Sequence, residues 1–513
     1  GTLDINSGGG SIEITGDITG NADGDEALIL DDNGTGSSGV ITLGGKVGAT
    51  GGSQFSAVSL IAAGGINLSD QITTSSVDGG TVTITGPVTL VEDIIIDADA
   101  ANTAINFSSA TGHINSDSTT GGHSLTLKTA TGAIDIEGKI GNSTALKSLD
   151  INSAGTPAGN ISIFQIGDTN AGVVEGGATT IGNTSSGKID FDGTIYKTGG
   201  TQTYRSDSGS KIVFTNSSGA TITTSADNVS FIKGDVIVED TTLTITTGGG
   251  TDAGNISIAG SLKGKANSPT SNVSFTSGAG TIDLHAISTD MEDVTLSGAT
   301  TLGGDITLAN SGVLDITGDV LVDLAELDID SSTGGGGNVT ITGKLDSASG
   351  GDKEVNILSG AGTVSITGAI GTGTNGTLQT LDINATAGSG AISLGDIGAN
   401  ATSGTGAITG ISRIGGASTT GKITLNGQYI NVGGAITFSG GSYEVANGST
   451  SLSIVTSSDN VDFNAGTISV GENAFIIDTD SSNGTGATDG ANITIDGDII
   501  GLSPTSGNTA ADL

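Results

Sequence analysis

The sequence contains no cysteine and no tryptophan, and only 4 of its 513 residues are proline. Without cysteine, the chain has neither a disulfide framework nor thiolate ligands for a metal. No stretch is long and apolar enough to cross a bilayer as a helix. These absences exclude a small disulfide-stapled fold, a cysteine-based zinc site and a membrane-spanning helix.

Basic residues are also scarce, since 15 Lys and Arg stand against 54 Asp and Glu and the formal net charge is −39. A field of this sign repels nucleic acid and anionic membranes, so we expect no nucleic-acid partner. Of the 54 acids, 43 are Asp, whose short side chain bonds nearby backbone amides in turns. The charge favours a salty medium or divalent cations, because both screen the repulsion.

Aromatic residues make up only 3% of the chain, and few aromatics with high net charge are typical of disorder. Here, however, Ile, Val and Leu alternate through nearly every segment, and the mean hydropathy is +0.11. Glycine is the other abundant residue, at 90 of 513. The composition therefore predicts an ordered chain with a thin aliphatic core.

A short phrase returns seven times, starting at residues 3, 94, 149, 243, 327, 381 and 475. At its clearest it reads Leu-Asp-Ile-Asn at 149–152, then a turn of small residues, then Asn-Ile-Ser-Ile at 160–163. This period of two predicts β-strands with one buried face, joined by turns. The residues that it predicts to point into the core include Ile134, Ile136, Ile161, Ile163, Ile256 and Ile258.

The phrases are 91, 55, 94, 84, 54 and 94 residues apart, so a long-short-long pattern repeats every 232 to 240 residues. We therefore predict two complete modules, residues 1–242 and 243–474, and a truncated third module over residues 475–513. Because the third module has only opened at Phe475, we expect either that the polypeptide continues beyond Leu513 or that the first rung of another subunit covers the open edge, and we favour continuation. The next phrase is then expected 84 to 91 residues after Phe475.

Many short strands without an amphipathic helix fit either a β-solenoid or a series of β-sandwich domains. Gly and Asx at corners, a narrow aliphatic core and the absence of an ~100-residue domain period favour the solenoid. We predict an all-β, elongated β-solenoid of about 20 rungs, at ~25 residues a rung, with serial β-sandwich domains as the alternative. Residues 57–63 have some helical propensity, but they lie between glycine turns and are predicted to form a strand.

Three segments carry a resemblance to a known class of proteins: Gly80–Leu90, which reads GTVTITGPVTL, Gly362–Gly371 and Gly421–Leu425. They resemble the repetitive β-helical regions of filamentous-haemagglutinin-like exoproteins and autotransporter passengers, which are large secreted bacterial adhesins. The resemblance is one of style and covers most of the chain. It implies an extracellular location at the cell surface and a structural or adhesive role in a filament, stalk or adhesin. The expected partners are further copies of the chain or of its repeats, and cell-surface glycans.

Paired acids are the candidate metal ligands, and they lie at or just after the end of a phrase strand: Asp97 and Asp99, Asp328 and Asp330, and Asp478 and Asp480. Residues two apart on a strand face the same way, so each pair can offer oxygens to one Ca²⁺. The equivalent positions of other copies carry Asn or Thr, which favours turn formation on a solvated rim. No cofactor is required by the sequence, and Ca²⁺ is the one that these pairs suggest.

Catalytic signatures are missing from the sequence. The histidines are scattered, at His113, His123 and His285, and none has metal-ligand spacing. There is no nucleophile elbow, P-loop or zinc signature. A glycan-active β-helical enzyme, with two carboxylates in a cleft, is the alternative function, although a glycan cleft usually also needs aromatic platforms. A calcium-dependent matrix or surface-layer protein is a further alternative. We predict that the chain is not an enzyme and has no catalytic residue.

Overall fold

The computed structural model describes residues 1–21, 24–32, 38–48, 53–75, 80–98, 103–118, 120–248, 254–267, 270–349, 353–372, 376–398, 408–416, 421–445, 451–471, 474–480 and 490–501. Within these ranges the chain is all-β, with one 3-10 turn at Thr333–Gly335. The strand ladders are parallel and join each strand to one about a turn further along the chain. Sandwich domains are built from antiparallel sheets, so that alternative is wrong. The prediction of a β-solenoid is confirmed, with about 17 turns.

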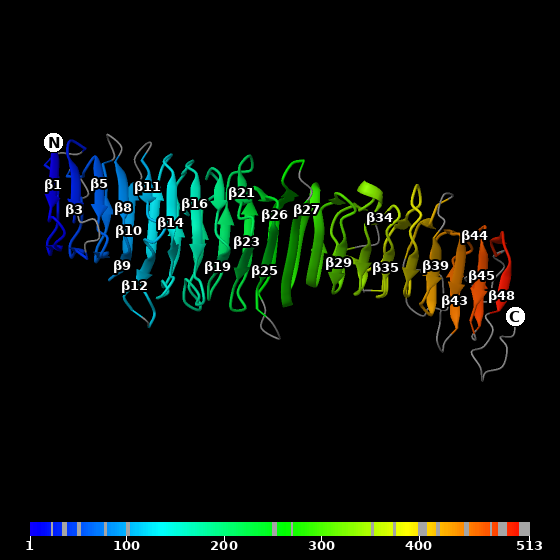
Figure 1. The fold of residues 1–513 in the computed structure, drawn as a ribbon. Coiled ribbons are helices and arrows are strands. Elements are labelled where there is room, and N and C mark those ends of the chain that lie inside the picture. The colour runs from blue at the N-terminus through cyan, green and yellow to red at the C-terminus, as the bar shows by residue number, and fades with distance from the viewer. Residues whose placement is uncertain are drawn as a thin grey trace. The chain divides into compact units, whose positions relative to one another are not determined.

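The chain divides into two compact units, described separately here. Unit 1 comprises residues 1–261 with 277–280, and unit 2 comprises residues 262–276 with 281–513. Within each unit the rungs stack in chain order, as the run of colours in Figure 1 shows. The predicted module boundaries after residues 242 and 474 concern sequence repetition rather than compactness, and they stay a prediction.

One face of unit 1 shows how the core is built. Its strands follow one another as β1 (Thr2–Asn6), β3 (Ala27–Asp31), β5 (Ala57–Ile61), β8 (Thr81–Thr85), β11 (Ile105–Phe107), β14 (Ile134–Ile140), β16 (Ile161–Ile166), β18 (Ile189–Phe191), β21 (Lys211–Phe214) and β24 (Asp235–Val238). Strand β5 confirms the prediction of a strand, not a helix, after residue 57.

Aliphatic side chains stack in register inside this face. One column, each member at most 1% exposed, is Leu28, Val58, Val82, Ile105, Ile134, Ile161, Ile189, Ile212 and Val236. All six isoleucines that the alternation assigned to the core are at most 1% exposed, so that prediction is confirmed. Burial of such stacks stabilises the solenoid. Because each rung contacts only its neighbours, the total stabilisation is roughly a sum over pairs of adjacent rungs.

Unit 2 repeats this construction on two faces. The first runs through β29 (Leu314–Thr317), β32 (Val339–Ile341), β35 (Val364–Ile366), β37 (Ile392–Leu394), β39 (Lys422–Leu425), β42 (Ser442–Val445) and β45 (Thr467–Val470). The second runs through β28 (Ile306–Leu308), β31 (Glu326–Asp330), β34 (Glu354–Leu358), β36 (Thr380–Ile383), β38 (Ser412–Ile414), β41 (Ile436–Ser439) and β44 (Val461–Asn464).

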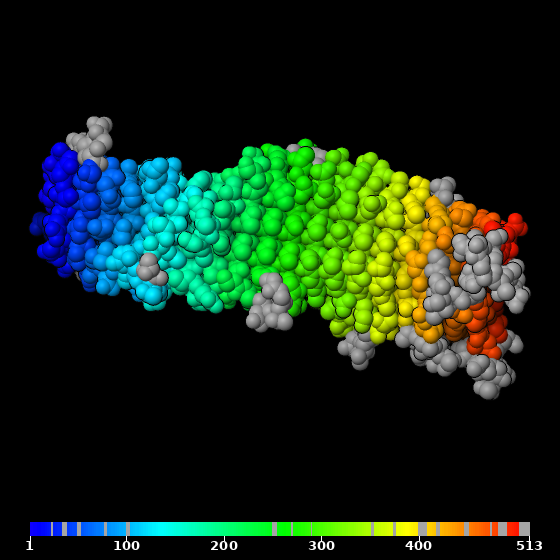
Figure 2. Space-filling view, turned by 60° about the horizontal axis from the view of Figure 1, so that its bottom comes forward, coloured from blue at the N-terminus to red at the C-terminus, as the bar shows by residue number. Residues whose placement is uncertain are grey.

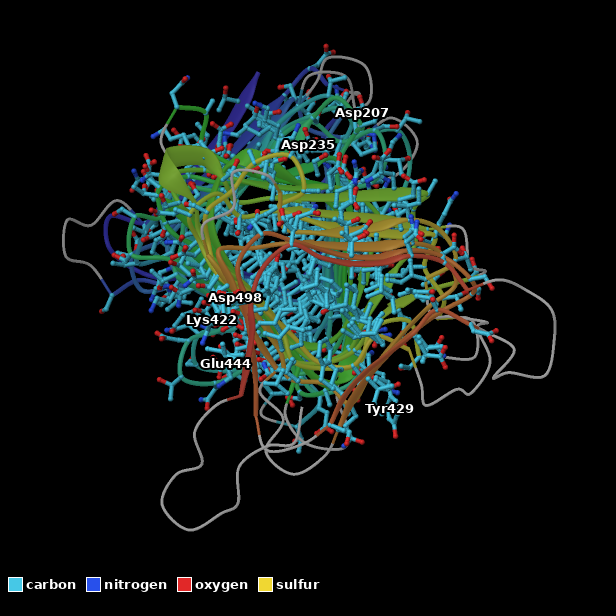
Figure 3. The ribbon with its side chains drawn as sticks, turned by 90° about the vertical axis from the view of Figure 1, so that its right-hand side faces the viewer. Asp207, Asp235, Lys422, Tyr429, Glu444 and Asp498 are labelled. Atoms are coloured by element: carbon cyan, nitrogen blue, oxygen red, sulfur yellow. The ribbon has the colours of Figure 1, made fainter. Side chains whose placement is uncertain are left out.

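Charged side chains lie on the solvent-facing side of these strands. In Figure 3, Lys422, Glu444 and Asp498 lie together on one side of unit 2, and Tyr429 of β40 (Tyr429–Val432) lies on another side. Lys422 Nζ donates a hydrogen bond to Glu444 Oε2 across β39 and β42. Outward positions of β39 and β42 therefore carry charged side chains.

Rung length varies more than the sequence predicts. Hydrogen bonds from a backbone N–H to an aspartate side chain of the preceding rung join residues 20 apart at Val313 and Asp293, but 33 apart at Tyr429 and Asp396. The predicted count of about 20 rungs is therefore too high, because it assumed a uniform ~25 residues.

Asx side chains form clasps between neighbouring rungs. The carboxamide or carboxylate oxygen accepts a backbone N–H of the next rung, as in Asn160 with Lys188 at 3.0 Å and Asp319 with Lys344 at 2.9 Å. The same contact recurs at Asp17, Asp93, Asn115, Asn228, Asp235, Asn272, Asp293, Asp305, Asn338, Asp346, Asp382, Asp396 and Asn460. These Asx side chains therefore join one rung to the next, which the expectation of simple turn formers did not include.

Glycine columns allow the rungs to approach closely at a corner of unit 2. A Cβ added to Gly362 would lie 2.0 Å from the carbonyl oxygen of Gly337, and one on Gly390 would lie 1.7 Å from that of Gly362. No side chain fits at such distances, so these positions require glycine. Figure 2 shows the result, since successive chain segments within each unit lie in direct contact.

Candidate binding groove

A surface groove of about 780 Å³ lies on the outward face of unit 2, over β28, β31, β34, β36 and the start of β38. Pockets of this size accommodate small ligands or short segments of polymer. Six carboxylates line the groove: Asp305, Glu326, Asp328, Asp330, Glu354 and Asp382. Among the described lining residues, Arg413 is the one cation and no side chain is aromatic.

The parallel register arranges these side chains in columns. Asp328 of β31 pairs with Asn356 of β34, which pairs with Asp382 of β36, which pairs with Arg413 of β38. Alternate residues of a strand face the same way, so a second column lies beside the first. It runs from Glu326 through Glu354 to Thr380.

Asn356 organises the acidic end of the groove. Its Nδ2 donates to Glu326 Oε1 at 2.9 Å and to Asp328 Oδ1 at 2.8 Å. The backbone N–H of Asp328 in turn donates to Asp305 Oδ1 at 3.1 Å. One neutral amide thus holds two carboxylates of β31 in place and leaves their charge uncompensated.

Arg413 compensates charge at the other end. Its Nε donates to Asp382 Oδ2 at 3.0 Å, and its backbone N–H donates to Asp382 Oδ1 at 3.0 Å. The hydrogen bonds and charge of Asp382 raise the pKa of the Arg413 guanidinium. The Asp382 side chain is only 12% exposed, so its charge is largely covered by Arg413. Among the described lining residues, the other five carboxylates therefore have no cation beside them.

An apolar surface lies next to this ion pair. Ile411 stands two residues before Arg413 and is 61% exposed. Leu358, at the end of β34, also lines the groove and is half-buried, but it pairs in register with Asp330, away from Ile411. The groove therefore combines an acidic end over β31 and β34 with an apolar end at Ile411.

Two of the predicted calcium ligands, Asp328 and Asp330, lie in this groove on the same outward face of β31. Asp328 contacts Asn356, as described above. Asp330 Oδ1 accepts hydrogen bonds from Ser332 N at 2.8 Å and Ser332 Oγ at 2.6 Å. Asp330 is therefore an Asx turn former, with one oxygen already bonded within the chain.

The other predicted ligands lie elsewhere. Asp97 faces Lys128, with 3.8 Å between Oδ2 and Nζ, and Asp99 lies outside the described residues. Asp478 Oδ1 accepts the N–H of Asp480 at 2.9 Å, which is again an Asx turn. Within the described ranges, no three His, Cys, Asp or Glu side chains are grouped so as to hold a metal ion. Calcium binding at the Asp pairs stays a prediction.

A separate polar cluster surrounds His123 in unit 1. Its Nε2 lies 2.9 Å from Asp117 Oδ1 and its Nδ1 lies 4.0 Å from Asp93 Oδ1, while Lys147 Nζ lies 3.6 Å from Asp93 Oδ2. The pKa of Asp93 is lowered, chiefly because the backbone N–H of Ser124 donates to it, and Lys147 and His123 add to the effect. These contacts cross rungs and are explained by ion pairing.

Sequence reasoning missed most of the groove. Glu326 and Glu354 are separated by a whole rung in sequence, and their neighbourhood depends on a register that no local pattern reveals. The available signal was the alternation of Glu326, Asp328 and Asp330, which places three acids on one face of a strand. Ile411 gave no signal, since an isolated isoleucine before a strand reads as core.

Comparison with protein-family models, with curated proteins and with solved structures found no match to this chain. The resemblance to repetitive adhesins therefore stays a prediction. Among the described residues, no helix is both long enough and apolar enough to span a membrane.

Proposed function

We propose that the chain is an extracellular, non-catalytic β-solenoid with a structural and adhesive role, part of a larger repetitive surface filament, stalk or adhesin. The observation that carries the proposal is the linkage between neighbouring rungs over the described residues of each unit. Parallel ladders, Asx clasps and glycine columns all act between neighbouring rungs. Such linkage distributes load over many backbone hydrogen bonds, as a stalk requires.

Two further features support this role. The outward face carries acidic residues, and a net charge of −39 opposes nonspecific association of neighbouring filaments. The absence of cysteine means that stability outside the cell would rest on packing and backbone bonding rather than on disulfides. In this proposal the expected partners are further copies of the repeats and cell-surface glycans.

One observation favours the second candidate, a glycan-active enzyme: carboxylates line a concave groove. Glycoside hydrolysis uses two such groups on opposite sides of the scissile bond. In the groove, however, Glu326 and Glu354 are register partners on adjacent strands of the same sheet face. Both carboxylates would therefore lie on the same side of a bound sugar chain. This arrangement fits binding of the chain better than hydrolysis, which needs carboxylates on opposite sides of the scissile bond.

Beads coated with the full chain test both candidates at once. The readouts are bead retention on cell monolayers under flow and release of reducing ends from a panel of polysaccharides. Retention above that of beads coated with an inert protein, with no release of sugar, supports the adhesive proposal. Sugar release that disappears in Glu326→Gln and Glu354→Gln variants would overturn it in favour of the enzyme, and absence of both activities would also count against adhesion.

A further inference from the structure

We propose that the groove of unit 2 binds a short, extended, basic segment of a partner protein, with two cationic side chains followed by an apolar one. The proposal rests on the proposed adhesive function, because it names the partner class that the adhesive face would take. Three observations carry it: the concavity over β28 to β38, the charge of its acidic end and the exposed Ile411 at the other end.

Charge complementarity decides the sign of the partner. Glu326 and Asp328 are held by the neutral amide of Asn356, and no cation lies beside them in the described lining of the groove. The single arginine is engaged with Asp382. Anions would meet repulsion here, whereas ammonium or guanidinium groups would find carboxylates already oriented.

The apolar end selects a peptide over a simple polyamine. Ile411 is 61% exposed, so its apolar side chain is accessible to a ligand that lies along the groove. A polyamine would leave this surface in water. A peptide that carries a leucine or isoleucine would cover Ile411 while its cations contact the acidic end.

Spacing fits an extended chain lying across the strands. Glu326, Glu354 and Thr380 lie on three successive rungs, and Ile411 lies on the next rung, two residues before the Arg413 that pairs with Asp382. Three rung spacings amount to ~14 Å. In an extended peptide the side chains at i, i+2 and i+4 face one way and also span ~14 Å. Cations at i and i+2 and an apolar residue at i+4 therefore match the column.

The test uses the full chain and a fluorescein-labelled acetyl-Lys-Ser-Lys-Ser-Leu-amide peptide, with binding followed by fluorescence anisotropy. A double variant, Glu326→Gln with Glu354→Gln, should weaken binding at least about five-fold, because two exposed ion pairs are lost. Glutamine keeps an oxygen for Asn356, so the fold is retained. The matched control, Glu13→Gln with Glu137→Gln, removes two exposed acids of unit 1 and should leave affinity unchanged.

Two further variants test the sign and the apolar contact. Arg413→Gln frees the Asp382 carboxylate and should strengthen binding of the lysine peptide, the opposite of what an anion site would show. Ile411→Ser should weaken binding of this peptide but not of the same peptide with serine in place of leucine. Affinity should also fall with added salt.

Several results would overturn the proposal. They are the absence of binding, equal weakening by the unit 1 control pair, or tighter binding of a glutamate-for-lysine peptide. If spermidine bound as tightly as the peptide, the ligand class would be a small polyamine, and the peptide proposal would be overturned. Bead retention that persists when peptide binding is absent would overturn this inference alone. Peptide binding without bead retention would instead count against the adhesive function.

Discussion

Asn152 and Thr129 are joined by two hydrogen bonds between neighbouring rungs of unit 1. The N–H of Thr129 donates to Asn152 Oδ1 at 2.7 Å, and Asn152 Nδ2 donates to Thr129 Oγ1 at 2.9 Å. Asn152 is 1% exposed and has a φ of 52°, a left-handed conformation that asparagine tolerates better than most residues. Asn384 makes the same contacts with Ser359 in unit 2, at a φ of 49°.

Replacement of this asparagine tests the importance of the contact. Asn152→Ala removes both hydrogen bonds, leaves the Thr129 N–H buried and places alanine at positive φ, so we expect a loss of about 3 kcal/mol in the free energy of unfolding. Asn152→Gly removes the same bonds without the backbone strain and should cost less. Chemical denaturation followed by circular dichroism measures both. Asn106→Ala, on the outward side of β11, should change stability by less than about 0.5 kcal/mol; an equal loss there would contradict the assignment.

Glycine columns give a second prediction. Gly362→Ala would place Cβ 2.0 Å from the Gly337 carbonyl oxygen, so neighbouring rungs must separate. We expect a cost of about 3 kcal/mol or more, at the upper end of overpacking effects, because backbone cannot move aside as a side chain can. The matched substitution is Gly16→Ala, where Cβ meets nothing within 4 Å. That variant should be neutral or up to about 1 kcal/mol more stable, and similar melting of the two variants would refute the close approach.

Core alternation gives a third prediction. Ile161 is fully buried in β16, between Ile134 and Ile189. Ile161→Asp buries an unpaired charge and should cost several kcal/mol, roughly 4 or more. Thr83→Asp, on the outward side of β8 between Ser59 and Asn106, should be tolerated. Thermal unfolding of both variants is the measurement, and an unchanged midpoint for Ile161→Asp would show that the side chain does not face the core.

These residues also show what the sequence could predict. Inward positions such as Ile161 follow from a local period of two, so the fold class and the core were predictable. The partner of Asn152 was not predictable, because its separation of 23 positions from Thr129 includes a corner of unpredictable length. The groove was hidden for the same reason. Its acids become neighbours only when the register of β31, β34 and β36 is known.

Divalent cations give the fourth prediction. If the Asp pairs bind Ca²⁺, the melting temperature should rise more with Ca²⁺ than with Na⁺ at equal ionic strength, since screening alone depends on ionic strength. Asp328→Asn with Asp330→Asn should remove part of this excess, whereas Glu13→Gln with Glu137→Gln should not. Equal responses to the two cations would assign the pairs to turn formation, as the Ser332 contacts of Asp330 already do for one oxygen.

Alkaline pH gives the last prediction. Burial raises the pKa of Tyr196 and Tyr204, and that of Tyr443 is also raised by burial. Unfolded tyrosines ionise near pH 10, roughly, so the folded state holds these protons more tightly. The stability that the hydroxyls contribute is then fully present below about pH 10 and falls as the pH rises above it.

Absorbance at 295 nm should therefore show the buried tyrosines ionising together with the loss of circular dichroism. Tyr196→Phe with Tyr204→Phe removes two of these groups and should make unfolding less steep in pH. Ionisation of Tyr196, Tyr204 and Tyr443 in a chain that keeps its circular dichroism would contradict their burial.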